Sequence, residues 1–191
     1  MKQAQQPSVK QLVEAFIFTA KTPLSCDELI DLIASHSTLS QQELHALLLE
    51  IEEEFKDRGV ALVKLASGYR FQTQPHLAPI LKSLHQKQQP KFSKAFLETL
   101  ALIAYHQPVT RADMENLRGV AVNYSFLQTM LERKWIQVVA YKDVPGRPAL
   151  YATTTEFLNY FGLNSLDALP KLNNEQEHQA QPLTSTLYKE L

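Results

Sequence analysis

One order of predicted elements occurs twice along this chain, and it constrains the fold more than any other feature. Each half has three segments whose apolar residues recur at the spacing of an amphipathic helix, followed by two short β-prone runs around a turn. The predicted elements of the first half are 8–20, 26–34, a helix capped at Ser40 with its apolar stripe over 44–55, 60–66 and 69–73. Those of the second half are 92–106, 111–118, a helix marked by apolar residues over 126–131, 136–141 and 149–153. Three helices followed by a hairpin form the winged-helix version of helix-turn-helix. The sequence therefore predicts an α+β, mainly helical fold of two tandem winged-helix domains with short β-hairpin wings.

A Ser or Thr three residues before an acidic residue marks several of the predicted helix starts, because the two side chains can cap the first turn reciprocally. These pairs are Ser25 with Glu28, Ser40 with Glu43, Thr110 with Asp113, and Thr153 with Glu156. The last pair predicts a final helix that ends at Gly162, and a further helix is predicted over residues 77–85.

A polar run, QKQQPK, separates the two halves of the chain. We therefore expect a first winged-helix domain over residues 1–88 and a second over residues 89–170. The remaining residues, 171–191, include the run NNEQEHQAQP, which is polar and has no helical or strand periodicity. We expect a disordered polar tail there, in which Leu183 and Leu187 form either a weak terminal helix or a partner-binding segment.

The composition limits where this chain can act. A formal net charge of −1 gives no strong overall attraction to DNA or to an anionic membrane. The longest fully apolar run covers residues 100–105, far short of the ~20 residues that cross a bilayer, and the start of the chain has no secretory-signal pattern. Cys26 is the one cysteine, so an internal disulfide is excluded. We expect a cytoplasmic protein without a membrane contact.

Catalytic and metal-binding motifs are missing from the sequence. None of the six histidines has a Cys or Glu at metal-ligand spacing, and the five glycines form no phosphate-binding loop. Scattered carboxylates give no recognisable acid and base pair. We therefore predict a protein that is not an enzyme and holds no cofactor or metal, with a metal-free hydrolase as a distant alternative that a pocket with perturbed titrating groups would revive.

A winged helix raises the question of DNA binding, which charge argues against. The third predicted helix of the first half contains EIEEEF, residues 50–55, and this acidic face would repel phosphates. The corresponding helix of the second half has no cation before Arg133. Residues 91–170 hold eight Lys and Arg against seven Asp and Glu, a net charge of +1. We expect weak direct DNA binding at most, and a dimeric winged-helix transcriptional regulator is the alternative function.

Both first helices carry apolar residues outside the predicted core stripe. Phe18 points away from the stripe of its helix, with Ala15 beside it, and Leu102 and Tyr105 fall nearly opposite the stripe of the other helix. Such second faces often mark a protein interface. The alternative is burial by another part of the same chain, such as a hairpin or the final helix.

A stiff turn joins the last two predicted strands. Val144, Pro145, Gly146 and Arg147 fit a type II turn, with Pro at the second position and Gly at the third, and Pro148 should hold Arg147 extended. A turn that is rigid before binding loses little entropy on docking. The turn could therefore bind a partner, or it could only close the hairpin while Arg147 pairs with a carboxylate such as Asp143.

The sequence resembles the bacterial segregation and condensation protein B (ScpB) family. The matching segments, which lie in order between residues 8 and 170, are EAFIFTAKTPLSCDEL (14–29), GYRFQT (68–73), ETLALIAYHQPVTRADMENLRGV (98–120), LERKWI (131–136) and KDVPGRPALYATTTEFLNYFGLNSLDALP (142–170).

The resemblance implies a function and a set of contacts. It implies a non-catalytic homodimer that binds a kleisin of the segregation and condensation protein A type, and through it an SMC ATPase, in nucleoid-associated chromosome condensation and segregation. It assigns Phe18 to the dimer interface of the first domain, and we expect Ala15, which lies beside Phe18, to belong to that interface too. The second domain would bind the kleisin through Tyr105, Arg111, Arg118, Val144, Pro145, Gly146, Arg147 and Pro148, to which the off-stripe helix face adds Leu102.

Overall fold

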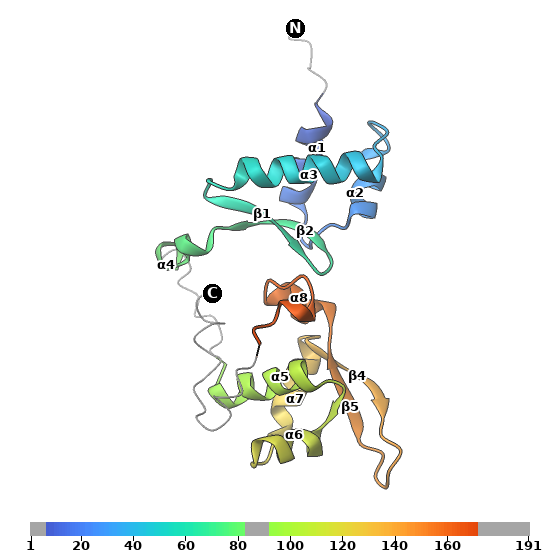
Figure 1. Ribbon diagram of the computed structural model, residues 1–191, viewed down its shortest axis with the longest axis vertical. Coiled ribbons are helices and arrows are strands. Elements are labelled where there is room, and N and C mark those ends of the chain that lie inside the picture. Colours follow the sequence, from blue (N-terminus) through green and yellow to red (C-terminus); the bar gives the residue numbers. More distant parts are fainter. Residues whose placement is uncertain (1–6, 83–91, 172–191) are drawn as a thin grey trace. The chain divides into compact units, whose positions relative to one another are not determined.

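The structure, a computed structural model, describes residues 7–82 and 92–171 (Figure 1). The chain forms two compact units, one on either side of residues 83–91. Both units combine helices with a small antiparallel sheet, which confirms the mixed helix and sheet class. The described helices all lack the length and apolar character that crossing a membrane requires.

The first unit consists of three helices followed by a hairpin and a short helical segment. Its elements are α1 (Val9–Thr19), α2 (Cys26–Ile33), α3 (Gln41–Phe55), β1 (Val60–Leu65), β2 (Gly68–Thr73), the 3-10 helix η1 (Pro75–Leu77) and α4 (Ala78–Leu81). The capping boxes predicted at Ser25 and Ser40 are both present, and α1 has another at Ser8. The helix expected over 77–85 is shorter in the described part, and residues 83–85 lie outside it.

The core of the first unit joins one face of each helix to the hairpin. Its buried side chains are Val13, Ile17, Leu29, Ile33, Leu44, Leu48, Ile51, Leu62 and Tyr69. At the start of β2, the backbone of Tyr69 exchanges hydrogen bonds of 2.8 and 2.9 Å with Leu24. Gly68 permits this approach, since a Cβ on Gly68 would lie 2.1 Å from the Leu24 carbonyl oxygen. The hairpin is thereby fixed against the segment that precedes α2.

The second unit repeats this order and adds a short strand and a final helix. Its elements are α5 (Lys94–His106), β3 (Val109–Thr110), α6 (Arg111–Arg118), α7 (Tyr124–Glu132), β4 (Ile136–Tyr141), β5 (Ala149–Thr153), α8 (Thr155–Tyr160) and the 3-10 helix η2 (Leu166–Ala168). The three strands are antiparallel in the order β3-β5-β4, so β4 is an edge strand. The two predicted strands of the hairpin have the bounds expected, while β3 was not predicted because two residues show no periodicity.

The core of the second unit is rich in aromatic residues. Its large buried side chains include Phe96, Leu100, Ile103, Met114, Val122, Leu127, Met130, Trp135, Ile136 and Phe157. The ring of Trp135 contacts Phe96, Phe161 and Tyr160. The core therefore ties α5 to the segment that follows the hairpin.

One helix start was predicted wrongly. Thr154, not Thr153, caps α8 by accepting a hydrogen bond from the Phe157 N–H at 3.3 Å. Pairing with Ile136 extends β5 through Thr153, whose hydroxyl instead donates to the Gln107 side-chain oxygen at 2.9 Å. The expected disordered tail lies outside the described residues, apart from Lys171.

Candidate functional site

The first unit presents an aromatic residue to solvent on α1. Phe18 is 71% exposed, as expected for a residue off the core stripe, and Ala15 is exposed one turn earlier. The Phe18 ring lies edge-on to Phe71 of β2, with centroids 6.3 Å apart, and Phe71 contacts Phe55 at 4.8 Å. We call Ala15, Phe18 and Phe71 the Phe18 patch. The exposed Phe18 ring thus lies next to the packed rings of Phe71 and Phe55. A second apolar surface that covered these rings would exclude water from them.

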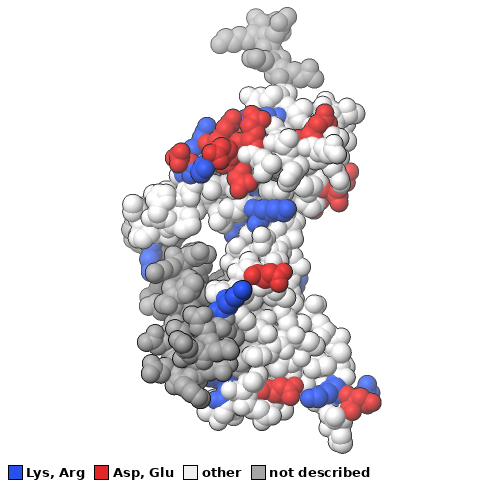
Figure 2. All heavy atoms as spheres, in the orientation of Figure 1, with Lys and Arg blue, Asp and Glu red and all other residues white. Residues whose placement is uncertain are grey.

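The acidic face of α3 lies in the same unit. Lys10 of α1 pairs with Glu50 at 2.7 Å and with Glu54, and Glu53 pairs with Lys56 at 3.1 Å. Hydrogen bonds to Glu50 and Glu54 raise the pKa of Lys10 above its ordinary value. Figure 2 shows red carboxylates gathered over this helix. Such a surface repels phosphates, which agrees with the expectation of weak DNA binding.

The face of α5 that carries Tyr105 is partly covered by the end of the second unit. The Tyr105 hydroxyl donates a 2.6 Å hydrogen bond to the Pro170 carbonyl oxygen, and burial raises the pKa of this phenol. Leu102 is half-buried and packs against the core. The sequence left open whether Leu102 and Tyr105 form a protein interface or are buried by another part of the same chain. In this structure the same chain partly buries both residues.

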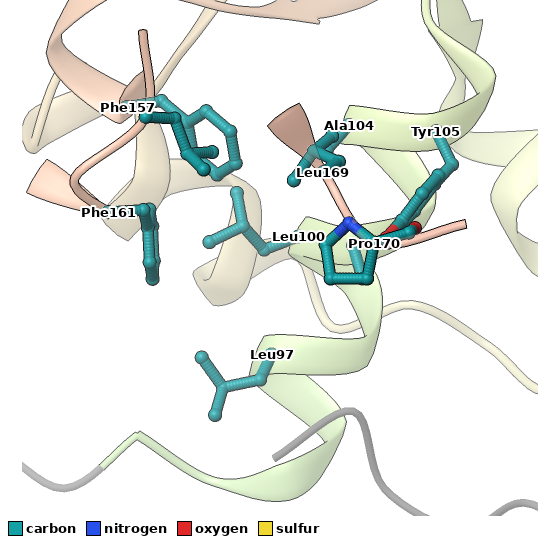
Figure 3. A pocket seen from close by; sticks show the side chains of 10 residues that line it. Leu97, Leu100, Ala104, Tyr105, Phe157, Phe161, Leu169 and Pro170 are labelled. Atoms are coloured by element: carbon teal, nitrogen blue, oxygen red, sulfur yellow. The ribbon is translucent and has the colours of Figure 1, made fainter. Parts of the chain in front are cut away.

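An apolar pocket remains beside Tyr105 (Figure 3). Its volume is about 40 Å³, and its lining comes from α5, α8 and the segment after α8. The lining residues are Leu97, Leu100, Ala101, Ala104, Tyr105, Phe157, Phe161, Leu163, Leu169 and Pro170. This lining offers almost no polar group to a ligand, so the pocket suits one small apolar side chain and no polar chemistry.

Arg118 is a structural residue in this unit. Its side chain is only 13% exposed and contacts Glu98 of α5 at 3.1 Å, and it also donates to the Thr99 hydroxyl at 3.4 Å. These bonds hold α6 against α5. With this low exposure, little of the Arg118 guanidinium is accessible to a partner protein.

Arg111 is more accessible, although it also has a carboxylate partner. Its side chain is 46% exposed and lies 2.9 Å from Glu115 on the same helix. Glu115 in turn accepts the Val122 N–H at 2.9 Å, and this hydrogen bond is the main cause of its lowered pKa. Arg111 is therefore held in place at the surface.

The turn between β4 and β5 has the predicted type. The Arg147 N–H donates to the Val144 carbonyl oxygen at 2.9 Å, and Gly146 has a φ of 86°, as a type II turn requires. Val144, Pro145, Gly146 and Arg147 are exposed, and Pro148 is half-buried.

One expectation about Arg147 was wrong. Its φ is 38°, so the residue is left-handed rather than extended. The chain has to reverse within one residue there, because the Lys142 N–H already bonds the Pro148 carbonyl at 2.9 Å. Ion pairs found in the described part of the chain include none between Arg147 and Asp143, and it is Lys142 that pairs, with Asp113 at 3.5 Å. Figure 2 shows the charged groups at the tip of this hairpin.

The predicted residues thus do not form one site: besides Arg111 and Arg118 on α6, they fall on three separate places. The Phe18 patch lies on the first unit, while the Tyr105 pocket and the hairpin turn lie on different parts of the second. The sequence reasoning missed the exposed apolar residues of β4, which are Val138, Val139 and Tyr141. Their signal was the uncharged run IQVVAY, which lacks the alternation of a strand with one buried face. Within the described residues no His, Cys, Asp and Glu cluster could hold a metal ion.

Comparison with known proteins gives consistent matches. The family model described as segregation and condensation complex subunit ScpB matches residues 11–172. The segregation and condensation protein B homolog of Coxiella burnetii is 46% identical over 165 residues, which cover 86% of this chain and 79% of that protein. Segregation and condensation protein B of Syntrophotalea carbinolica is 41% identical over 171 residues, 88% and 84% of the two chains.

Solved structures also match. The crystal structure of ScpB from Mycobacterium tuberculosis is 34% identical, with a TM-score of 0.36 over 81% of this chain and 95% of that one. A dimer of the ScpB N-terminal domain complexed with ScpA peptide is 27% identical, with a TM-score of 0.36 over 42% of this chain and 92% of that one.

Proposed function

This chain belongs to the segregation and condensation complex subunit ScpB family, and we propose that it is a non-catalytic accessory subunit of a bacterial SMC–kleisin complex. The observation that carries the proposal is the family match, which runs through both units from residue 11 to residue 172. A subunit of this kind acts by binding, which agrees with surfaces that offer apolar and cationic groups. We propose further that each unit is a winged helix, because three helices precede a hairpin in both.

The first unit is proposed to form a homodimer through the Phe18 patch. A related ScpB N-terminal domain is described as a dimer, and Phe18 is the most exposed large apolar side chain among the described residues, at 71%. Phe18→Asp would place a charge in an apolar contact and should convert dimers to monomers. Leu49→Asp is the matched control, because Leu49 is 53% exposed on α3 of the same unit. A wild-type chain that sediments as a monomer at micromolar concentration would refute the dimer.

The second unit is proposed to contact the kleisin through the hairpin turn and the Tyr105 pocket. The exposed Arg147 guanidinium suits a carboxylate on the partner, and the pocket, on another part of the unit, suits a small apolar side chain of the partner. A ScpA peptide is bound to a dimer of a related ScpB N-terminal domain, which supports a kleisin of that type as the partner, while the contact through the second unit rests on the surfaces described above.

Direct measurement of the complex tests this function. The full chain and the kleisin from the same bacterium are purified separately and titrated by calorimetry, and a stable complex is expected. Arg147→Ala should weaken binding by about 1–2 kcal/mol with no change in thermal stability, while Lys82→Ala, an exposed cation on the first unit, should leave the affinity unchanged. Failure of the wild-type chain to bind the kleisin would refute the proposed function.

A DNA-binding regulator is the second candidate, supported only by the winged-helix order of elements. Titration against random duplex near 0.15 M salt separates the two functions. We expect weak binding without sequence preference, and submicromolar, sequence-selective binding would favour the regulator.

A further inference from the structure

The edge strand β4 leaves an apolar surface open to solvent. Every residue from Gln137 to Tyr141 is exposed, including Val138 at 38%, Val139 at 48% and Tyr141 at 60%. Figure 1 shows the hairpin extending away from the three helices of its unit. Neither face of the outer part of β4 is therefore buried by the described residues of this unit.

The backbone of β4 is available for pairing. The Lys142 N–H bonds to Pro148 across the hairpin, and bonding alternates along an antiparallel strand. Tyr141, the preceding residue, therefore directs its N–H and C=O away from β5, toward the open edge. A bulge at Val139 separates this end of the strand from Val138.

Strand β4 has few of the features that usually protect an exposed edge. Exposed edge strands usually carry a charged residue or a proline that prevents pairing with other chains. Strand β1 has such a residue, the exposed Lys64, whereas IQVVAY has neither charge nor proline from Ile136 to Tyr141. Within β4, only the bulge at Val139 hinders pairing with another chain. This favours a strand that is covered by a partner in the functional complex.

Cations flank both ends of β4. Arg133 and Lys134 precede it, and both are exposed. Lys142 and Arg147 follow it. Lys142 pairs with Asp113 at 3.5 Å and has Asp143 beside it, so Arg147, which has no ion pair among the described residues, is the cation available at this end. At about 3.3 Å per residue, the eight residue steps from Lys134 to Lys142 span at most about 26 Å. A partner that pairs along β4 would meet apolar side chains in the middle and positive charge at each end.

We propose that β4 accepts an extended segment of the kleisin as a fourth strand of the sheet. The segment would carry apolar side chains at alternate positions and acidic residues toward its ends. Backbone hydrogen bonds provide affinity in such strand addition, and the side chains provide specificity. This inference rests on the proposed kleisin binding and adds the binding mode and the chemistry of the partner segment.

Hydrogen exchange tests the pairing directly. The full wild-type chain is compared with and without the full-length kleisin from the same bacterium. The outward-facing amides among residues 137–141, that of Tyr141 above all, should exchange at least tenfold more slowly in the complex. Protection confined to other residues would overturn the proposal while leaving kleisin binding intact. No complex at all would overturn both. Protection that rises with the concentration of the chain alone would show a second copy on β4 and overturn the kleisin segment as its occupant.

Two substitutions at one position separate backbone pairing from side-chain contact. Tyr141→Pro removes the outward N–H but leaves the Lys142 to Pro148 bond, and it should weaken kleisin binding about tenfold. Tyr141→Ala removes only the ring and should weaken binding less. Val120→Asp is the control, since Val120 is 56% exposed before α7. Equal losses for the two Tyr141 variants, with unchanged thermal unfolding, would refute strand addition.

Discussion

Replacing Arg118 by Met tests whether this residue holds two helices together or contacts a partner. Met keeps the apolar stem of the side chain and removes the guanidinium. Two hydrogen bonds are lost, one of 3.1 Å to the Glu98 carboxylate and one of 3.4 Å to the Thr99 hydroxyl. Because the Arg118 side chain is only 13% exposed, water does not compete strongly for these two hydrogen bonds in the folded protein.

The groups left behind limit the magnitude. The Thr99 hydroxyl still donates to the Ala95 carbonyl at 2.8 Å, and the Glu98 side chain is 36% exposed with Lys94 3.7 Å away. Neither becomes an isolated buried group, so the loss should lie at the low end of that for a charge-assisted bond, about 1–2 kcal/mol. In a unit of this size, that corresponds to a fall of roughly 1 M in the urea midpoint.

The assay uses a probe that belongs to the second unit alone. Trp135 is the one tryptophan of the chain and lies in the core of that unit, so its fluorescence follows unfolding there. Arg111→Met is the matched control, because its pair with Glu115 is exposed and should contribute less than about 1 kcal/mol. An unchanged midpoint for Arg118→Met, together with lost kleisin binding, would refute the structural role and make Arg118 a contact residue.

Three further predictions concern single positions. Gly68→Ala should destabilise the first unit by about 3 kcal/mol, because the new Cβ would lie 2.1 Å from the Leu24 carbonyl oxygen; urea unfolding followed by circular dichroism measures this, and a loss below about 1 kcal/mol would contradict it. Tyr105→Phe should cost the second unit about 1 kcal/mol, because the bond to the Pro170 carbonyl is lost while the ring still fills its place; Trp135 fluorescence reports the change, and no shift in the midpoint would mean that the bond is absent in solution. Hydrogen bonds from the Thr110 hydroxyl and N–H lower the pKa of Asp113. The carboxylate therefore contributes fully to the stability of the second unit above its unfolded pKa of about 4, and this contribution is lost as pH falls through the lower folded pKa. Asp113→Asn should flatten the dependence of unfolding free energy on pH between pH 5 and pH 2, and an unchanged dependence would exclude a contribution from Asp113.

Local signals predicted the helix starts and the turn well, because each depends on residues that are close in sequence. A Ser and a Glu three residues apart, as at Ser25 and Ser40, need only the first turn of a helix to bond each other. The Pro145 and Gly146 pair likewise restricts its own dihedral angles. The order of the helices and of the hairpin strands therefore followed from the sequence in both units, and β3 did not.

Sequence reasoning failed where a long-range pairing decided the conformation. Thr153 was expected to cap a helix, but pairing with Ile136 keeps it in β5. Strand β3 exists only because Val109 and Thr110 meet Tyr151 and Leu150. Arg147 is left-handed because the hairpin closes at Pro148. In each case the deciding contact joins residues that no local pattern connects.

The sequence by itself determined which side chains could form a surface, and only the tertiary structure decided which of them are free to do so. Phe18 and Tyr105 occupy similar off-stripe positions on their helices, yet Phe18 is 71% exposed while Tyr105 bonds to a residue 65 positions away. Arg118 and Arg147 carry the same group, but Arg118 is bound by Glu98, 20 positions earlier. The availability of a group depends on which distant segments the closed chain places against it, and helix periodicity holds no information about those contacts.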